Sequence, residues 1–234
     1  MDLKEGVKID FLGHSGFLIR FMVCGIDGKN CVEKKLVIDP YGVSPAIKDV
    51  DYVFITHSHY DHCSIEDIKK IIKKGTVIVI PPDAQSKLAK LEGVEVHLVE
   101  PGDEFIANNN LKVDSVNAYN LGKVFHPKSE GWVGFVLKFG KVIVYHAGDT
   151  DNIPDMQKLS GYGKKENYFV TLLPVSGKYV MNAEEACEVA SLLGPNLAIP
   201  MHYGAGVAGT HDDAKRFVEL CKGKNINAVV LDKI

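Results

Sequence analysis

Hydrophobic and polar residues follow two different periods along this chain. Short apolar runs rich in Val, Ile, Phe and Leu, bounded by Gly, Pro, Asn or Asp, are typical of β-strands. They predict strands near residues 7–12, 16–23, 34–39, 50–55, 76–80, 94–99, 111–118, 132–139, 141–147, 168–173, 197–201 and 226–231. Apolar residues at helical spacing predict helices at about 64–74, 83–91, 152–159, 182–193 and 211–222.

Capping signals mark several of these helix starts. Ser64 stands three residues before an aspartate, Asn182 three before a glutamate, and Thr210 three before an aspartate. Strands interrupted by helices that would cover the outer faces fit two packed sheets between two helix layers. We therefore expect an α/β fold, a four-layer αββα sandwich of two mixed β-sheets, in a single domain over residues 1–234.

Composition agrees with one catalytic unit. The 234 residues are 46% hydrophobic and carry a net charge of −3, which fits one α/β unit with a sizeable core. Lysines at 69–70 and 73–74 lie at helical spacing between isoleucines, as on a solvated helix face. This pattern, in a slightly acidic chain, argues against a protein that binds long nucleic acid. No apolar stretch approaches a membrane span and residues 1–5 do not resemble a signal peptide, so we expect a cytoplasmic protein whose oligomeric state stays open.

The cysteines do not suggest a disulfide framework. Their number is odd, and the chain is long for a fold that depends on disulfides. Cys24 and Cys31 flank a Gly-rich turn between two predicted strands, so a cross-strand pair is sterically conceivable, but we expect both to be reduced. Cys63 follows a histidine directly, yet a small buried residue that opens the next helix explains it better than a metal ligand.

The motif His-x-His-x-Asp-His follows the apolar run at 50–55 directly. On an extended or turning segment His57 and His59 project the same way, because side-chain direction repeats every second residue. Asp61 and His62 can then serve a second ion beside the first. Imidazole and carboxylate are the ligands that borderline divalent metals take. The motif therefore predicts a two-metal site, and the alternative is a polar loop that happens to be rich in histidine.

Three later residues fit the ligands that such a site still lacks. Each ion needs three or more protein groups and an open position for water or substrate. His126 lies in a loop flanked by Gly and Lys, Asp149 ends the apolar run at 141–148, and His202 ends the run at 197–201. These are the loop positions where functional residues gather in layered α/β folds. For His126 the alternative is a surface histidine before a turn-forming proline.

The order of these motifs resembles the metallo-β-lactamase superfamily over nearly the whole chain. Segments 12–18, 38–40, 145–150 and 200–204 resemble its branch of metal-dependent hydrolases, whose better-known relatives are ascorbate-phosphate lactonase and the phospholipase D that cleaves N-acyl ethanolamine phospholipids. The resemblance implies a first metal held by His57, His59 and His126. It implies a second metal held by Asp61, His62 and His202, with Asp149 bridging the two. Asp39 then orients a ligand histidine by accepting a hydrogen bond from the N–H of its other ring nitrogen.

A hydrolase of small molecules is the function that the resemblance implies. Two divalent ions, Zn²⁺ or Mn²⁺, would activate a water that attacks a small ester, lactone or phosphodiester. Asp61 would also handle protons, and His14 would act beside the substrate. Asn120 is a weaker candidate, as a donor to an oxyanion. The sequence contains neither a Gly-x-Ser-x-Gly elbow nor a Walker phosphate loop. This argues against catalysis by a serine nucleophile and against nucleotide-driven chemistry.

Two alternatives from other classes stay open. One is a non-catalytic metal-binding or sensor protein, in which the ions only stabilise the fold. The other is a redox-active di-iron member of the same superfamily, but such members act with a flavin partner domain, which this chain lacks. Lysine greatly outnumbers arginine, which also hints at a heat-adapted organism.

Overall fold

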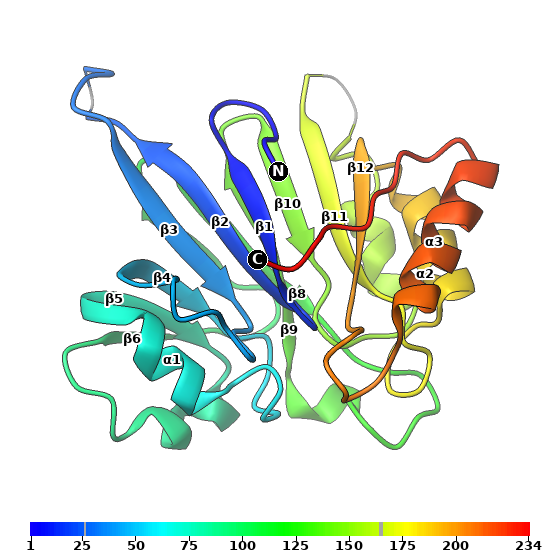
Figure 1. Ribbon diagram of the computed structural model, residues 1–234, viewed down its shortest axis with the longest axis horizontal. Helices are drawn as coiled ribbons and strands as arrows, with labels where there is room; N and C mark the ends of the chain where they lie inside the picture. Colours follow the sequence, from blue (N-terminus) through cyan, green and yellow to red (C-terminus); the bar gives the residue numbers. More distant parts are fainter. Residues whose placement is uncertain (26, 164–165) are drawn as a thin grey trace.

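Two mixed β-sheets pack face to face with helices on their outer sides, as Figure 1 shows. The computed structural model describes residues 1–25, 27–163 and 166–234, so Ile26 in the predicted Gly-rich turn lies outside them. The first sheet has the order β1 (Lys8–Gly13), β2 (Gly16–Val23), β3 (Val32–Ile38), β4 (Val50–Phe54), β5 (Ile72–Ile80) and β6 (Glu95–Leu98). The second has the order β12 (Leu197–Met201), β11 (Tyr168–Pro174), β10 (Val142–His146), β9 (Val133–Phe139), β8 (Leu111–Asn117) and β7 (Glu104–Asn108). The predicted αββα sandwich is confirmed.

Helices cover both outer faces and begin at the predicted caps. Helix α1 (Ile65–Ile71) lies outside the first sheet, and α2 (Ala183–Leu193) and α3 (His211–Gly223) lie beside the second (Figure 1). The side chains of Ser64, Asn182 and Thr210 each accept a hydrogen bond from the backbone N–H of the residue three positions later. Those of Asn182 and Thr210 belong to full capping boxes. Three short 3₁₀ helices are η1 (Pro82–Leu88), η2 (Lys128–Glu130) and η3 (Pro154–Leu159).

Strand alternation divides the apolar residues between two cores. Leu36 and Ile38 of β3 point into the large core between the sheets, whereas Val37 points into a smaller core beneath α1. Neighbouring strands share this register, because β3 and β4 are parallel and pair Val37 with Val53. Strands β4, β10 and β12 are buried on both faces, which is why they read as nearly continuous apolar runs in the sequence.

Several predicted elements differ from the structure. The segment at 226–231 forms only an isolated bridge between Ala228 and Ala198, and its apolar side chains pack on the large core. The helices predicted at 83–91 and 152–159 are the 3₁₀ helices η1 and η3, and the chain leaves α1 at Ile71 to enter β5. The edge strand β7 was not predicted, because its mixed polar and apolar residues lack a clear alternation.

The expectation of reduced cysteines is wrong for one pair. Cys24 and Cys31 form a disulfide, with Cα atoms 3.9 Å apart. The hairpin between β2 and β3 brings them together, because the N–H of Gly25 donates to the carbonyl of Lys29 at 2.8 Å. Cys63 is buried as a free thiol, as the sequence predicted. Among the described residues, no helix combines the length and the apolar character needed to cross a bilayer.

Candidate metal centre

The loop after β4 carries the His-x-His-x-Asp-His motif and bends back on itself. The N–H groups of His62 and Cys63 both donate to the carbonyl oxygen of His59, at 3.1 and 2.8 Å. Asp39 fixes the start of the loop from the parallel strand β3, because its carboxylate accepts from the N–H and the hydroxyl of Thr56 at 2.8 and 2.7 Å. The motif is therefore a rigid turn and not an extended segment.

Loops of the second sheet supply the other side chains. Asp149 follows β10 through Gly148, whose φ of +66° is left-handed and whose Cβ, if present, would lie 2.8 Å from a backbone carbonyl oxygen of β9. His126 lies in the connection between β8 and β9, and His202 follows β12. The N–H of His202 donates to the carbonyl of His14 at 2.7 Å, which ties this loop to the first sheet.

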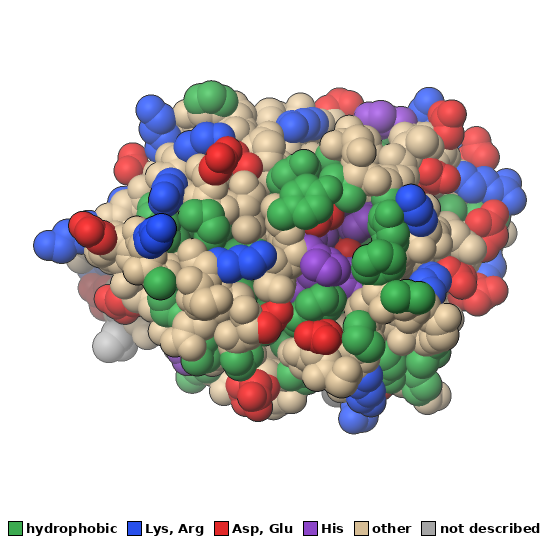
Figure 2. Space-filling view, turned by 90° about the horizontal axis from the view of Figure 1, so that it is seen from below, with side chains coloured by type: hydrophobic (Ala, Val, Ile, Leu, Met, Phe, Trp, Pro, Cys, Tyr) green, Lys and Arg blue, Asp and Glu red, His purple; other side chains and the backbone are tan. Residues whose placement is uncertain are grey.

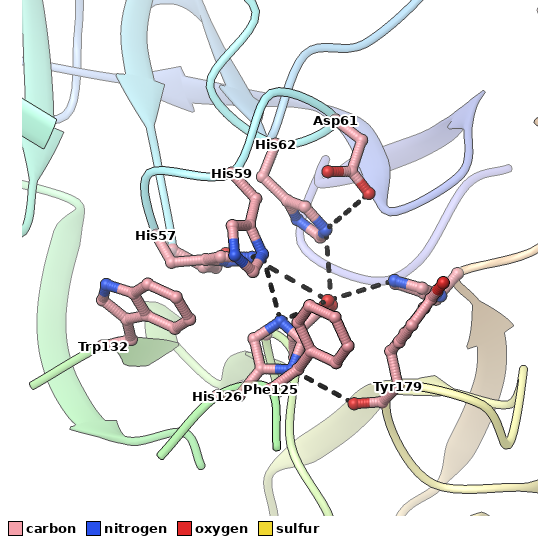
Figure 3. A network of polar contacts seen from close by, with 12 residues as sticks. His57, His59, Asp61, His62, Phe125, His126, Trp132 and Tyr179 are labelled. Atoms are coloured by element: carbon pink, nitrogen blue, oxygen red, sulfur yellow. Dashed lines mark hydrogen bonds and ion pairs between the residues drawn. The ribbon is translucent and has the colours of Figure 1, made fainter. Parts of the chain in front are cut away.

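All seven sequence-predicted ligands meet at one end of the two sheets. Figure 3 shows the rings of His57, His59, His62 and His126 converging in this region. Their ligand atoms fall into three overlapping groups, within each of which all atoms lie no more than 4.8 Å apart. The groups are His57, His59 and His126; His57, His62 and Asp149; and His14, Asp61, His62 and His202.

Asp149 lies at the centre of the cluster. Its Oδ2 is 3.0 Å from Nε2 of His202, 3.2 Å from Nε2 of His126 and 3.8 Å from Nε2 of His57. Its Oδ1 is 3.4 Å from Nε2 of His62. One carboxylate thus faces histidines of both expected metal positions, which is the arrangement that a bridging ligand requires.

In the described part of the chain, several buried polar atoms of this cluster lack a hydrogen-bond partner. Among the described residues, Asp149 Oδ1 and His62 Nε2 have no hydrogen-bond partner, although both are inaccessible to solvent. A buried polar atom without a partner is costly, and such atoms often mark an ion or water site. Both atoms are of the donor types that divalent metals take, so the residues present fit a metal centre.

The protonation states also fit. Burial lowers the pKa of His57 well below its ordinary value, and it lowers the pKa of His14 to about 4. Burial acts in the opposite direction on the Asp61 carboxyl, but the hydrogen bond from His14 and the nearby His62 outweigh it and bring its pKa to about 2. Neutral imidazole and ionised carboxylate are the forms that bind metals.

Burial also lowers the pKa of His62, but Asp149 and Asp39 on either side outweigh it and raise that pKa well above the ordinary value. Without an ion, the two carboxylates therefore favour the protonated form of His62. A divalent cation would take the place of that proton.

Three residues of the cluster and the neighbouring Asp39 have left-handed backbone conformations. The φ angles are +55° for His14, +44° for Asp39, +60° for His126 and +63° for His202. Residues with a Cβ rarely adopt this region, and each such residue costs on the order of 1 kcal/mol or more. Their concentration at one site shows that the surrounding fold holds these side chains in place at the expense of stability.

Partners outside the cluster orient the ligand rings. Asp39 Oδ2 accepts from Nδ1 of His62 at 2.8 Å, which confirms the contact expected for this carboxylate. Ser176 Oγ lies 2.9 Å from Nδ1 of His202, and the carbonyl of Tyr179 lies 3.1 Å from Nδ1 of His126. In each case Nε2 is left free to face Asp149.

The contacts of Asn120 agree with a role in the local turn, which is the alternative to the oxyanion donor. Its side-chain amide donates to the backbone carbonyls of Phe125 and Tyr179 at 2.9 and 2.6 Å, and its N–H donates to the carbonyl of His126. It therefore holds the loop that carries His126, and its amide N–H groups do not reach toward an oxyanion.

Sequence reasoning missed the residues around the cluster. A pocket of about 260 Å³ opens over it and is lined in addition by Tyr60, Phe125, Tyr179 and Val207. The only tryptophan of the chain, Trp132, lies with its ring centroid 4.8 Å from those of His57 and His59 (Figure 3). These residues carry no sequence signal of their own, because their role depends on which loops the fold brings together.

Comparisons with known proteins agree with this geometry. The family model described as Beta-lactamase superfamily domain matches residues 8–202. The chain is 32% identical over 231 residues to a UPF0173 metal-dependent hydrolase of Nanoarchaeum equitans, and the match covers 97% of each protein. It is 32% identical over 244 residues to a UPF0173 metal-dependent hydrolase of Pyrococcus furiosus, with 96% of each covered. The chain therefore belongs to the metallo-β-lactamase superfamily. Its most similar curated relatives place it within the UPF0173 family of metal-dependent hydrolases.

Solved structures show the same fold. A metallo hydrolase from the hyperthermophilic archaeon Ignicoccus hospitalis is 22% identical, with a TM-score of 0.71 and 97% of this chain covered. A di-iron β-hydroxylase from Streptomyces venezuelae is 14% identical, with a TM-score of 0.69 over 100% of this chain and 54% of its own. At these identities the likeness concerns the fold. The closer resemblance to ascorbate-phosphate lactonase and the N-acyl ethanolamine phospholipase stays a prediction.

Proposed function

We propose that this protein is a hydrolase of small molecules that uses two divalent metal ions, Zn²⁺ or Mn²⁺. His57, His59 and His126 would hold the first ion; Asp61, His62 and His202 would hold the second; and Asp149 would bridge them. The observation that carries the proposal is the position of Asp149, which faces histidines of both groups and keeps one buried oxygen without a partner among the described residues. His and carboxylate ligands suit these two metals.

The bound ions would supply Lewis acidity and lower the pKa of a water from about 15.7 toward 7. The protein supplies the rest. The Asp61 carboxylate, ionised because its pKa is about 2, can accept a hydrogen bond from the attacking water. His14 holds that carboxylate in place, because its Nε2 lies 2.9 Å from Asp61 Oδ2. The bond that breaks would belong to a small ester, lactone or phosphodiester.

Metal analysis and a substrate panel test this proposal. Protein purified without chelator should contain up to two divalent ions per chain, and the metal-loaded protein should hydrolyse a member of a panel of esters, lactones and phosphodiesters. A chelator should abolish turnover and leave the fold intact. A chain that stays metal-free in excess metal would refute the proposal. Full metal occupancy without turnover on any panel member would favour the non-catalytic alternative.

A cytoplasmic location is part of the proposal and must accommodate the Cys24–Cys31 disulfide. Such bonds are rare in the cytosol of mesophiles but common in intracellular proteins of hyperthermophiles. The excess of lysine over arginine in this chain supports a heat-adapted source. Free-thiol titration of protein from its native cytosol would check the pairing.

A further inference from the structure

The pocket over the candidate metal centre has a polar floor and an apolar wall. The floor consists of the cluster residues His59, Asp61, His126, Asp149 and His202. The wall consists of Tyr60, Phe125, Tyr179 and Val207. Figure 2 shows this face of the molecule, where histidines are visible in a hollow ringed by hydrophobic side chains. A substrate whose reacting group lies on the floor would place its remaining part against the wall.

The aromatic wall comes from both halves of the fold. On one side, Tyr60 belongs to the loop after β4, and its ring centroid is 5.9 Å from that of Tyr41. On the opposite side, the ring of Phe125 makes an edge contact with Tyr179 at 4.9 Å. Tyr60 is 63% exposed and Phe125 is 48% exposed. Large apolar side chains left exposed beside a polar pocket are typical of a ligand site.

Cationic side chains are absent from this pocket. Of the described residues that line it, none is Lys or Arg. Two lysines of the flanking loops have partners of their own. Lys123 pairs with Asp151 and donates to the carbonyl of Val180 at 2.7 Å, and the ammonium of Lys178 lies over the ring of the wall residue Tyr179 at 4.8 Å. An anionic group placed against the Phe125 ring, away from the proposed ions, would lose hydration without a lysine or arginine among the described lining residues to pair with it, which is costly. An apolar group there would be stabilised by burial.

We propose that the substrate is a neutral ester or lactone whose reacting carbonyl carries an uncharged, ring-sized apolar group, held against Phe125 and Tyr179. The inference rests on the hydrolase proposed above and narrows its substrate class. Water adds its oxygen to the carbonyl carbon, the bond from that carbon to the leaving oxygen breaks, and the leaving oxygen takes a proton. The products are a carboxylate, a proton and an alcohol, so no oxidant or other co-reactant is needed.

Three 4-nitrophenyl esters with the same leaving group test the apolar wall: the acetate, the benzoate and the anionic hemisuccinate, with bis(4-nitrophenyl) phosphate beside them. The metal-loaded full chain is used, and each kcat/KM is divided by the rate of the uncatalysed reaction. The benzoate should exceed the acetate by about tenfold, which is the effect expected from partial burial of one ring. The hemisuccinate and the phosphate should fall below the acetate. Equal values, or a preference for either anion, would overturn the proposal.

Variants locate the effect at the wall. Phe125→Ala should lower the value for the benzoate by about tenfold and that for the acetate by less than about threefold, and Phe125→Leu should retain part of the preference. Ile106→Ala removes an apolar side chain that is 69% exposed on β7, outside the pocket, and should change neither value. Metal content is measured for each variant, because Phe125 precedes His126. An unchanged preference in metal-loaded Phe125→Ala would contradict the assignment.

A binding measurement separates this inference from the hydrolase proposal. Calorimetry should find that benzohydroxamate binds the metal-loaded protein about tenfold more tightly than acetohydroxamate, and Phe125→Ala should remove the difference. If no ester, lactone or phosphodiester of the panel is hydrolysed but this difference is present, the hydrolase proposal fails while the apolar site stands. If esters are hydrolysed and the two hydroxamates bind equally, the apolar site fails while the hydrolase proposal stands.

Discussion

Two buried aspartates of this protein have opposite surroundings. Asp67, in the first turn of α1, accepts hydrogen bonds from the N–H groups of Gly42 and Val43, the hydroxyl of Ser64 and the ammonium of Lys70, at 2.8 to 3.3 Å. Both of its oxygens are satisfied by donors of the protein. Asp149 lies among histidines, and its Oδ1 has no hydrogen-bond partner among the described residues.

The difference separates a structural carboxylate from a candidate ligand. The donors around Asp67 fix a loop to a helix, and the arrangement is complete without any further group. The arrangement around Asp149 is incomplete, and its neighbours are held by left-handed backbone conformations and by outer partners such as Asp39. A protein that is stabilised by a cation at this position can retain such a site. Burial and charge alone would not have distinguished the two aspartates.

Asp149→Ala should have the largest effect on metal and activity. Without the carboxylate between them, two cations would repel each other strongly, so both ions should bind more weakly. We expect turnover to fall by on the order of a thousandfold or more, and metal content to fall further than for any ligand that serves one ion. Metal analysis after dialysis and kcat/KM on the best panel substrate check this. Asp67→Asn is the matched control, with metal content unchanged.

His202→Ala should weaken the second ion selectively. We expect its affinity to fall by about a hundredfold while the first ion stays bound, because His57, His59 and His126 remain. Trp132 offers a local signal for the first position, because its ring lies 4.8 Å from those of His57 and His59. The fluorescence response of Trp132 to added metal should persist in this variant. Loss of this fluorescence response would show that the two metal positions do not bind ions independently.

His14→Ala should reduce turnover and leave both ions bound when metal is in excess. The imidazole holds Asp61 and is placed outside the ligand set, so we expect roughly a tenfold to hundredfold loss of kcat or of affinity for the second ion. His14→Gln, which can still donate to Asp61, should recover part of the loss. Metal missing even in excess would mean that His14 is itself a ligand, as its place beside Asp61, His62 and His202 allows.

Asp67→Ala should affect stability instead. Removal of this carboxylate leaves the N–H groups of Gly42 and of the buried Val43 without their acceptor, so the free energy of unfolding should fall by about 2 kcal/mol. Denaturant unfolding of the metal-free protein measures it. Metal affinity should match that of the wild type, and a loss of metal binding would break the distinction between the two aspartates.

The smallest expected effect is the pH dependence of the stability that Asp67 contributes. Burial raises the pKa of Asp67, but Lys70, Ser64 and Gly42 outweigh it and lower that pKa below its ordinary value. The carboxylate therefore contributes stability fully above the unfolded-state pKa of about 3.9, and the contribution is lost as pH falls through the folded-state pKa. The stability difference between wild type and Asp67→Asn should be constant from about pH 7 to 5 and shrink below about pH 4. A difference that grew on acidification would contradict this assignment.

The sequence predicted what depends on local pattern and chain order. Buried strands can be recognised in the sequence as apolar runs, and the motif from His57 to His62 is compact enough to be recognised without the fold. Asp149 and His202 were placed by their positions at strand ends. The contact of His14 with Asp61 spans 47 residues and depends on a left-handed turn, so no local signal reports it.

The pocket wall and the disulfide escaped prediction for a related reason. Phe125 and Tyr179 are ordinary aromatic loop residues until the fold pairs them, and the structure places them in contact from different loops. The predicted turn made a bond between Cys24 and Cys31 sterically conceivable, but the odd number of cysteines and the length of the chain favoured the reduced form, and the structure shows the disulfide. That the chain forms a single domain over its whole length stays a prediction.

A crystal structure of the metal-loaded protein, with anomalous scattering data for the added metal, tests the central claim most directly. The account predicts two anomalous peaks in the cluster, each within coordination distance of one carboxylate oxygen of Asp149. One peak should be surrounded by His57, His59 and His126, and the other by Asp61, His62 and His202. A single peak, or an Asp149 side chain that coordinates one ion only or points away from both, would contradict the bridging role.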